Sequence, residues 1–175
     1  MEKINIYDDF LTAEEMAQCR RIISTSNWEY GHDSNSNSSI NTPFWYMELI
    51  TYDFYKIQIK NKIEKLMNKK FNVLRVYANG QTFGQDGCYH LDSTSEKDTT
   101  FCVYITPVPS DSIKDLNGHI LFRIPTLHNF IVGIEPLCNR AVSFPSLYYH
   151  RGTSFSRYFQ NIRICIAFKL EEITE

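Results

Sequence analysis

The chain lacks the features that mark several large classes of protein. It has no run approaching the roughly 20 apolar residues of a membrane helix, and no N-terminal hydrophobic segment resembles a signal peptide. Its formal net charge is only −2, so neither a membrane nor a nucleic acid is expected as a partner. Internal repeats and long linkers are also absent. The 175 residues are therefore predicted to form a single domain, residues 1–175.

Paired cysteine motifs are missing too. The five cysteines are scattered, odd in number and include no Cys-x-x-Cys; they are Cys19, Cys88, Cys102, Cys138 and Cys165. A small secreted domain held by disulfides would be expected to carry an even set. We therefore expect a reducing environment and a cytoplasmic protein.

Helical patterns dominate the first 70 residues. Residues 12–15 (Thr-Ala-Glu-Glu) have the form of a capping box, and a helix should continue from them to about Thr25. Gly31–Pro43, rich in Ser and Asn, predicts a loop, and Phe44–Leu49 predicts a strand. Thr51–Lys70 fits a second amphipathic helix. Its inward residues should be Phe54, Ile57, Ile63, Leu66 and Met67.

From Phe71 onward the pattern changes to strands and turns. Helices followed by a run of strands are typical of an α+β protein. On this interpretation residues 1–70 supply helical support and a loop, and residues 71–170 supply the stranded core.

The most informative short pattern is His90-Leu91-Asp92. On an extended strand, alternate side chains share a face, so His90 and Asp92 can reach one ion while Leu91 points into the packing. His150 would add a third ligand from a distant strand. Two imidazoles and one carboxylate leave positions open on the metal, the arrangement used for non-haem Fe(II) oxygen chemistry.

A second informative residue is Arg163, which lies in an apolar run. Alternation predicts a strand covered on both sides, with Arg163, Cys165 and Ala167 on one face and the isoleucines Ile162, Ile164 and Ile166 on the other. A guanidinium is rarely buried without a partner. The partner is either an acidic residue of this chain or the carboxylate of a ligand, which arginine can bind through two parallel hydrogen bonds.

Together these residues resemble the Fe(II)/2-oxoglutarate-dependent dioxygenases, in particular the prolyl-4-hydroxylase-like branch. The resemblance covers about Phe71 to Leu170. Its segments follow one another in the family's order: Phe71–Tyr77, Tyr89–Asp92 as the ligand strand, Thr99–Ile105, Asn117–Phe122 as a degenerate Gly-Gly-x-Leu-x-Phe segment, Arg140–Phe144, and Tyr149–Gly152.

The resemblance implies a fold, a set of ligands and a reaction. The fold is a double-stranded β-helix, the cupin-like jelly roll of about eight strands, supported by N-terminal helices. The resemblance gives His90, Asp92 and His150 the roles of iron ligands. It gives Arg163 the role of binding the far carboxylate of 2-oxoglutarate, and it gives the hydroxyls of Tyr104 and Tyr77 the role of assisting Arg163. The reaction consumes O₂ and 2-oxoglutarate, releases succinate and CO₂, and hydroxylates a C–H bond, with ascorbate as a possible requirement for full activity.

One departure concerns the arginine. Arg163 lies thirteen residues after His150, a few more than is usual in the family, so the loop Gly152–Asn161 should be longer here. Arg157 stands at a shorter spacing, but it lies in a predicted loop without strand alternation. Arg163 is therefore the preferred candidate.

The primary substrate stays open at the level of sequence. The nearest resemblance suggests a prolyl residue of a peptide or protein, and a free amino acid or another small molecule fits the motifs equally well. A nucleobase demethylase is not favoured, since that branch usually has a second arginine where this chain has Lys169. The alternative from another class is a non-catalytic jelly-roll module that only binds a metal or ligand.

Overall fold

The computed structural model describes residues 4–34, 38, 40, 42–109, 116–124 and 130–173, and the structural statements below concern these residues. Within them the elements follow in the order β1 (Asn5–Tyr7), α1 (Ala13–Thr25), β2 (Glu29–His32), β3 (Phe44–Glu48), η1 (Phe54–Ile59, a π-helix), α2 (Lys60–Met67), β4 (Phe71–Gln81), β5 (Asp98–Tyr104), β6 (Ile120–Ile124), β7 (Phe130–Ile134), β8 (Ala141–Pro145), β9 (His150–Gly152) and β10 (Arg163–Glu172). No helix among them is both long enough and apolar enough to cross a bilayer.

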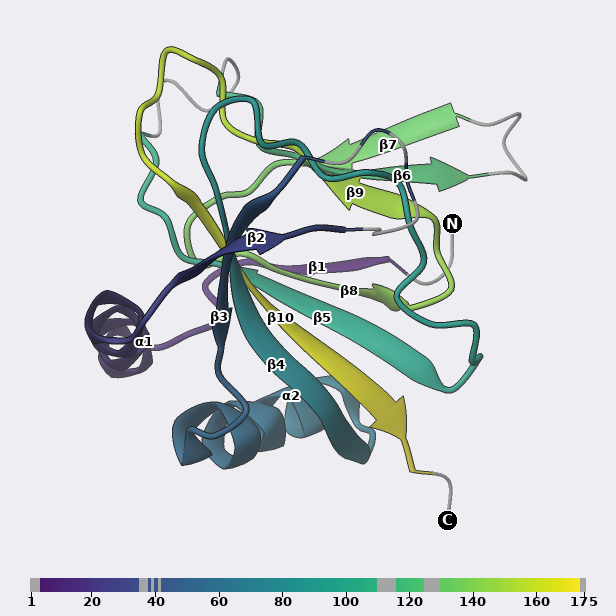
Figure 1. Cartoon of the computed structure of the whole chain (residues 1–175). Coiled ribbons are helices and arrows are strands. Elements are labelled where there is room, and N and C mark those ends of the chain that lie inside the picture. Colours follow the sequence, from purple (N-terminus) through teal and green to yellow (C-terminus); the bar gives the residue numbers. More distant parts are fainter. Residues whose placement is uncertain are drawn as a thin grey trace.

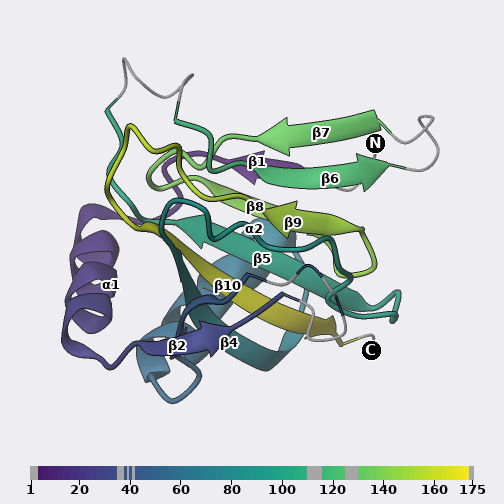
Figure 2. The ribbon, with the colours of Figure 1, turned by 45° about the horizontal axis from the view of Figure 1, so that its top comes forward.

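The strands form two antiparallel sheets, a larger and a smaller one (Figures 1 and 2). The larger sheet has the order β1-β8-β5-β10-β4-β3-β2, and the smaller has the order β7-β6-β9. A core of apolar side chains lies between them, where Phe122 of the smaller sheet meets Phe144 of the larger with ring centroids 4.8 Å apart. The sheet-rich α+β prediction is confirmed.

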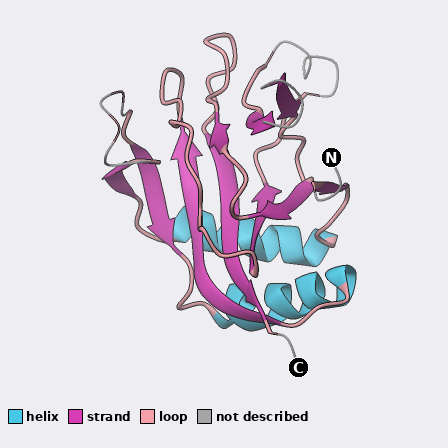
Figure 3. Cartoon of the chain, turned by 90° about the vertical axis from the view of Figure 1, so that its right-hand side faces the viewer, coloured by secondary structure: helices cyan, strands magenta, loops and turns pink. Residues whose placement is uncertain are grey.

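The helices lie against the other face of the larger sheet, and Figure 3 shows both on the same side of the long strands. The capping box is present as predicted: the Thr12 hydroxyl accepts from the Glu15 amide, and the Glu15 carboxylate accepts from the Thr12 amide. The buried face of α1 carries Met16, Cys19 and Ile23. The Cys19 thiol reaches the hydroxyl of Tyr55, which ties α1 to the second helical segment.

The second helical segment differs from the expectation in its first half. Residues Phe54–Ile59 form a π-helix, and only Lys60–Met67 is α-helical. A π-turn has i→i+5 hydrogen bonds, so the period of 3.6 residues used to assign the inward face does not apply there. Ile57, predicted to face inward, is 48% exposed, while Tyr55 and Ile59 are buried in its place. Leu66, also predicted inward, is 44% exposed.

The first 70 residues contribute three strands, one of which, β3, is the strand predicted at Phe44–Leu49. β1, β2 and β3 all join the larger sheet, where β3 pairs with β4. The β2 strand includes Gly31 and His32, which fell at the start of the predicted loop Gly31–Pro43; residues 35–37, 39 and 41 of that loop lie outside the described part of the chain. The result is that His32 is held on the sheet, paired with Phe44 of β3.

Strand β4 contains a β-bulge that decides which side chains reach the space between the sheets. Arg75 pairs with Lys169 of β10, but the next pair is Val73 with Leu170, so Leu74 is the extra residue. Because a strand alternates its faces, one extra residue reverses the alternation. Val73 therefore packs with Val76 against the helix-side core, and Arg75 falls on the same face as Tyr77.

Candidate metal centre and adjoining cavity

His90, Asp92 and His150 are brought together by pairing across the open end of the smaller sheet. The amide of His90 donates to the carbonyl of His150 and the amide of His150 donates back, each over 3.0 Å. The amide of Asp92 donates to the carbonyl of Ser146 over 2.9 Å. The predicted ligand strand is therefore wrong in detail: only His90 makes a β-bridge. Leu91, expected in the packing, is 43% exposed, because the segment pairs with one neighbour and leaves its outer side uncovered.

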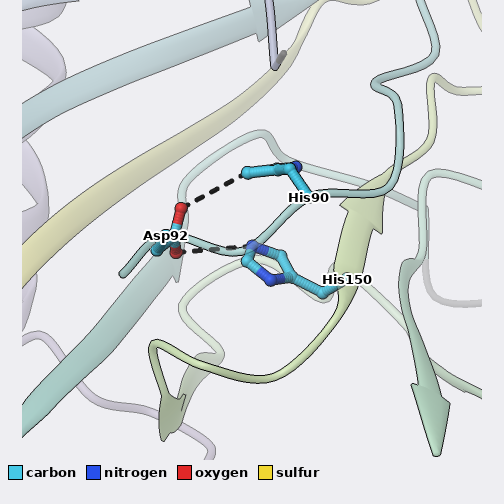
Figure 4. Close-up of side chains that lie close together, drawn as sticks. All are labelled: His90, Asp92 and His150. Atoms are coloured by element: carbon cyan, nitrogen blue, oxygen red, sulfur yellow. Dashed lines mark ion pairs between the residues drawn. The ribbon is translucent and has the colours of Figure 1, made fainter. Parts of the chain in front are cut away.

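The three side chains point toward one another (Figure 4). Nε2 of His90 lies 3.3 Å from Oδ1 of Asp92, and Nε2 of His150 lies 3.4 Å from Oδ2 of Asp92. One potential ligand atom from each of the three residues lies within 4.8 Å of the others. An ion placed among them would be within reach of all three.

Backbone carbonyls fix the two imidazoles in the orientation and tautomer that a metal ligand needs. Nδ1 of His90 lies 3.0 Å from the carbonyl of Cys88, and Nδ1 of His150 lies 2.8 Å from that of Tyr148. A carbonyl can only accept, so each Nδ1 carries a proton, and in a neutral ring the lone pair is then on Nε2. Burial lowers the pKa of His150 to about 4, so this ring is neutral near pH 7. Lone pairs and a carboxylate thus face one point, which a cation would stabilise.

Asp92 is ionised and held in place by two further side chains. The hydroxyl of Thr100 donates to its Oδ2 over 2.6 Å, and the ammonium of Lys169 pairs with the same oxygen. Burial alone would raise the pKa of the Asp92 carboxyl, but Lys169 and the two imidazoles outweigh it and hold the pKa well below the usual range. Oδ1 is left to face His90.

Lys169 was not predicted as a site residue, although its spacing from Arg163 in the sequence places it on the same face of the strand. It lies on β10 at an even spacing from Arg163, and so on the same face by simple alternation. What the sequence does not contain is the register that brings Asp92 beside it. The ammonium is buried, and its pKa is raised because the attraction of Asp92 outweighs the burial that would lower it.

Arg163 is buried, at 3% exposure, at the far end of the same face. Its Nε donates to the carbonyl of Gly118 over 2.6 Å, its Nη1 donates to Oε1 of Gln81 over 2.7 Å, and its guanidinium lies 5.0 Å from the centre of the Tyr104 ring. In the part of the chain that the structure describes, no Asp or Glu carboxylate comes within 4.0 Å of it. Of the two partners considered from sequence, an internal salt bridge is therefore not found among these residues.

The carbonyl that binds Arg163 is presented by a left-handed turn at Asn117 and Gly118, with φ of 58° and 78°. A side chain at Gly118 would also be strained at that φ, and its Cβ would lie 2.7 Å from the ring of Phe155. The competing arginine, Arg157, is exposed, bonds the hydroxyl of Tyr158, and does not line the cavity described next.

A cavity of about 290 Å³ connects the three candidate ligands with Arg163. Cys165, Ala167 and Lys169 of β10 line it, while Ile164 and Ile166 pack on the helix-side core, so the two faces of β10 lie as the alternation predicted. The small side chains of Cys165 and Ala167 leave the floor of the cavity open.

The two tyrosines assigned to the co-substrate both line this cavity. The hydroxyl of Tyr104 is buried and has no hydrogen-bond partner among the described residues, and burial raises its pKa well above the usual range, so it keeps its proton as a donor. Oδ1 of Asn79 is a second buried polar atom without a partner there. Buried polar atoms are nearly always satisfied, so these two indicate a polar ligand. Tyr77 lies 6% exposed, with the ammonium of Lys169 5.7 Å from its ring centre.

The outer end of the cavity holds residues that the sequence did not single out for this role. His32 lines it and packs against the rings of Phe44, Tyr46 and Tyr77. It is not part of the ligand group of His90, Asp92 and His150. Burial lowers the pKa of His32, and nearby Arg75 adds to the effect. The sequence pattern gave no signal for this end, because His32 fell in the predicted loop Gly31–Pro43.

No model of a known protein family matches the chain, and no curated protein matches it in sequence. Solved structures do match it in fold. One is a 2OG-Fe(II) oxygenase family oxidoreductase from Burkholderia pseudomallei, with a TM-score of 0.73 and 8% identity, over 97% of this chain and 85% of that one. Another is a prolyl hydroxylase from Trichoplax adhaerens in complex with a hypoxia inducible factor peptide, with a TM-score of 0.71 and 14% identity, over 98% and 84% of the two chains.

A third similar structure is HygX from Streptomyces hygroscopicus, with nickel, 2-oxoglutarate and hygromycin B bound. It has a TM-score of 0.68 and 8% identity, over 97% of this chain and 82% of that one. These likenesses show that the chain has the fold of the 2-oxoglutarate oxygenases. The molecules bound in the matched structures differ widely, from a peptide fragment to hygromycin B.

Proposed function

We propose that the protein is an Fe(II)- and 2-oxoglutarate-dependent dioxygenase that hydroxylates a C–H bond. The observation that carries the proposal is the convergence of His90, Asp92 and His150, with both Nε2 lone pairs directed at the carboxylate. The fold supports it, and so does a buried arginine at the other end of the same cavity. The proposal includes a fold and a location. Residues 71–170 form a double-stranded β-helix, residues 1–70 support it within the same domain, and the protein is cytoplasmic.

His90, Asp92 and His150 would hold the iron. Two imidazoles and one carboxylate suit Fe(II) and leave positions for the co-substrate and oxygen. With O₂ and 2-oxoglutarate bound, the metal supplies the oxidation, in which 2-oxoglutarate becomes succinate and CO₂ and one oxygen atom enters the substrate C–H bond. Thr100 and Lys169 would keep Oδ2 of Asp92 engaged and so orient Oδ1 toward the metal.

Arg163 would bind the far carboxylate of 2-oxoglutarate, with the Tyr104 hydroxyl as a second donor and Tyr77 closer to the metal. Gln81 and the Gly118 carbonyl hold the guanidinium in one orientation before any ligand arrives. A planar guanidinium can donate two parallel hydrogen bonds to a carboxylate, so its fixed position selects a dicarboxylate of the right length.

The substrate is a residue of a peptide or protein, a prolyl residue by the resemblance, or a small molecule of the same reaction class. The alternative from another class is a jelly-roll module that binds metal and ligand without turnover. The two are separated by co-substrate chemistry, because only the enzyme would convert 2-oxoglutarate to succinate.

The test is to incubate the purified protein with iron, ascorbate and 2-oxoglutarate, and to measure succinate. Asp92→Ala is the matched control, and exclusion of O₂ is the second. Succinate formed by the wild type alone, and only with O₂, supports the enzyme. Host proteins and metabolites can then be searched for a mass increase of about 16 units, one oxygen atom. Metal binding with no succinate under any iron condition would instead favour the binding module.

A further inference from the structure

Arg75 is a cation that the proposed reaction does not use, and it lies at the outer end of the same cavity. The bulge at Leu74 places Leu74 and Arg75 together at the cavity lining. Bulges commonly redirect a side chain beside a functional site. Without the extra residue, Val73 and Arg75 would share a face, because residues two apart on a regular strand point to the same side.

The guanidinium of Arg75 lies against another side chain of the cavity lining. Its Cζ lies 4.7 Å from the centre of the Tyr77 ring, a cation–π contact with a residue that also lines the cavity. Its partner across the strands is Lys169, a second cation. Like charges directly opposite on antiparallel strands are destabilising, so this placement is unfavourable unless something offsets it.

Lys169 is already balanced by Asp92, and Arg75 is not balanced in the same way. In the described chain no carboxylate lies within 4.0 Å of Arg75. Arg75 hydrogen-bonds the side chain of Tyr46 and is attracted by Glu48 of the neighbouring strand β3. Glu48 lies outside the cavity lining and accepts from the Tyr46 hydroxyl over 2.6 Å and from the amides of Leu49 and Ile50.

The charges lining the cavity lead to the same residue. Three cationic side chains and two carboxylates line it, so its formal charge is +1; they are Arg75, Arg163, Lys169, Asp33 and Asp92. A divalent metal and a dicarboxylate co-substrate cancel each other, which leaves the loaded cavity at +1. Lys169 is paired with Asp92 and Arg163 faces the co-substrate end, which leaves Arg75 and Asp33 as one cation and one carboxylate at the outer end, a combination that suits a ligand carrying both charges.

We propose that Arg75 binds a carboxylate of the primary substrate, and that this substrate is a free amino acid rather than an internal residue of a protein chain. The inference rests on the proposed function and narrows its substrate. An internal prolyl residue offers no carboxylate, whereas every free amino acid does. The cavity, at about 290 Å³, lies at the lower end for ligand pockets and must also hold the co-substrate. Asp33, which lines the same end, is placed to receive the ammonium group.

The experiment compares free amino acids with their α-amides, which differ only in the carboxylate. Protein loaded with Zn(II) and 2-oxoglutarate, which cannot turn over, is titrated with each pair in a calorimeter. For the wild type we expect at least one free amino acid to bind at least about tenfold more tightly than its amide, equal to about 1.4 kcal/mol. A dipeptide with the same C-terminal residue tests whether a chain terminus can supply the carboxylate.

Arg75→Gln should reduce the affinity for that free amino acid to the level of its amide and leave the amide unchanged. Arg75→Lys should keep part of the preference, because the charge stays while the planar fork is lost. Arg157→Gln is the matched control, since Arg157 is exposed and lies outside the cavity, and it should behave as the wild type. All three variants should bind 2-oxoglutarate within about twofold of the wild type, which also shows that they are folded.

The outcomes separate this inference from the proposed function. If the wild type fails to bind 2-oxoglutarate, the proposed function and the inference both fail. If 2-oxoglutarate binds but no free amino acid is preferred over its amide, only the inference is overturned. It is also overturned if Arg75→Gln keeps the preference, or if the dipeptide binds more tightly than the free amino acid.

Discussion

Two arginines line the same cavity in opposite surroundings. Arg163 is 3% exposed and bonded to a backbone carbonyl and to Gln81, while Arg75 is exposed and contacts the side chains of Tyr77 and Tyr46. A guanidinium fixed before binding suits a ligand that is the same in every reaction cycle, because little side-chain freedom is lost on binding. An exposed guanidinium suits a ligand whose shape is less constrained. The difference between the two arginines fits a constant co-substrate at the inner end of the cavity and a substrate particular to this protein at the outer end.

The comparison depends first on the metal centre that both arginines are proposed to serve. His150→Ala removes a candidate ligand, and we expect metal-dependent succinate formation to fall by more than about 100-fold, since even residues behind the ligands contribute about 10–100-fold. Metal content and succinate are the measurements. His119→Ala is the control, because His119 is outside the convergent group. Full turnover in His150→Ala would remove the basis for both assignments.

The next largest effect concerns the third cation, Lys169. Lys169→Met leaves the buried Asp92 carboxylate without its partner, which should reduce the free energy of unfolding of the metal-free protein by about 3–5 kcal/mol. Bound Zn(II) would supply the missing positive charge, so the loss should shrink when metal is present. Urea unfolding with and without Zn(II) measures both values.

Lys69→Met is the matched control for that prediction. Lys69 is a partly exposed lysine paired with Glu172, and an exposed pair of this kind contributes about 0–1 kcal/mol. An equal loss for Lys169→Met with and without metal would mean that Lys169 supports the fold and not the metal centre.

Arg163, at the inner end of the cavity, should affect the binding of the co-substrate and not the binding of the metal. Arg163→Ala would leave a buried carboxylate unpaired, a penalty of roughly 2–5 kcal/mol. Apparent 2-oxoglutarate affinity should then fall by about 30-fold or more, and Arg163→Lys should recover only part of it. Metal binding should survive both changes. A titration of succinate production checks this, and a large loss in Arg157→Ala with a normal Arg163→Ala would show that the wrong arginine was assigned.

The smallest effect concerns the packing of Gly152 against Gln81 and Arg163 at the inner end of the cavity. A Cβ at Gly152 would lie 3.2 Å from Oε1 of Gln81 and 3.4 Å from Nη1 of Arg163. Gly152→Ala should therefore disturb their hydrogen bond by about 1 kcal/mol, the low end for overpacking, and weaken 2-oxoglutarate roughly fivefold. The preference for a carboxylate at Arg75 should not change. If that preference changes as much as 2-oxoglutarate affinity does, the two ends are coupled and the comparison fails.

The sequence predicted best what depends on neighbours along the chain. The capping box and the two faces of β10 follow from spacings of two to four residues, and both were found as expected. The π-helix at Phe54–Ile59 was missed. Its hydrogen bonds join residues five apart instead of four, and the spacing of apolar residues over six positions does not distinguish the two kinds of helix.

Contacts between distant segments were harder to predict. That His90, Asp92 and His150 lie together agrees with the sequence. His150 begins strand β9, but the segment from His90 to Asp92 makes only one β-bridge, at His90, and the amide of Asp92 bonds the carbonyl of Ser146. The partnership of Lys169 with Asp92 depends on how β10 meets that loop. The place of Arg75 depends on a bulge, and a one-residue shift in strand register has no local signature.

The bulge in β4 also has an evolutionary consequence. Residues beyond it toward Gln81 keep their pairing with β10, and residues before it are anchored in the helix-side core. A single-residue deletion or insertion at Leu74 would thus change the side chain beside Arg75 at the outer end of the cavity without moving Arg75, Tyr77, Gln81 or Arg163. Substrate preference can in this way diverge among descendants by an indel in one strand, while the machinery for oxygen and 2-oxoglutarate is inherited unchanged.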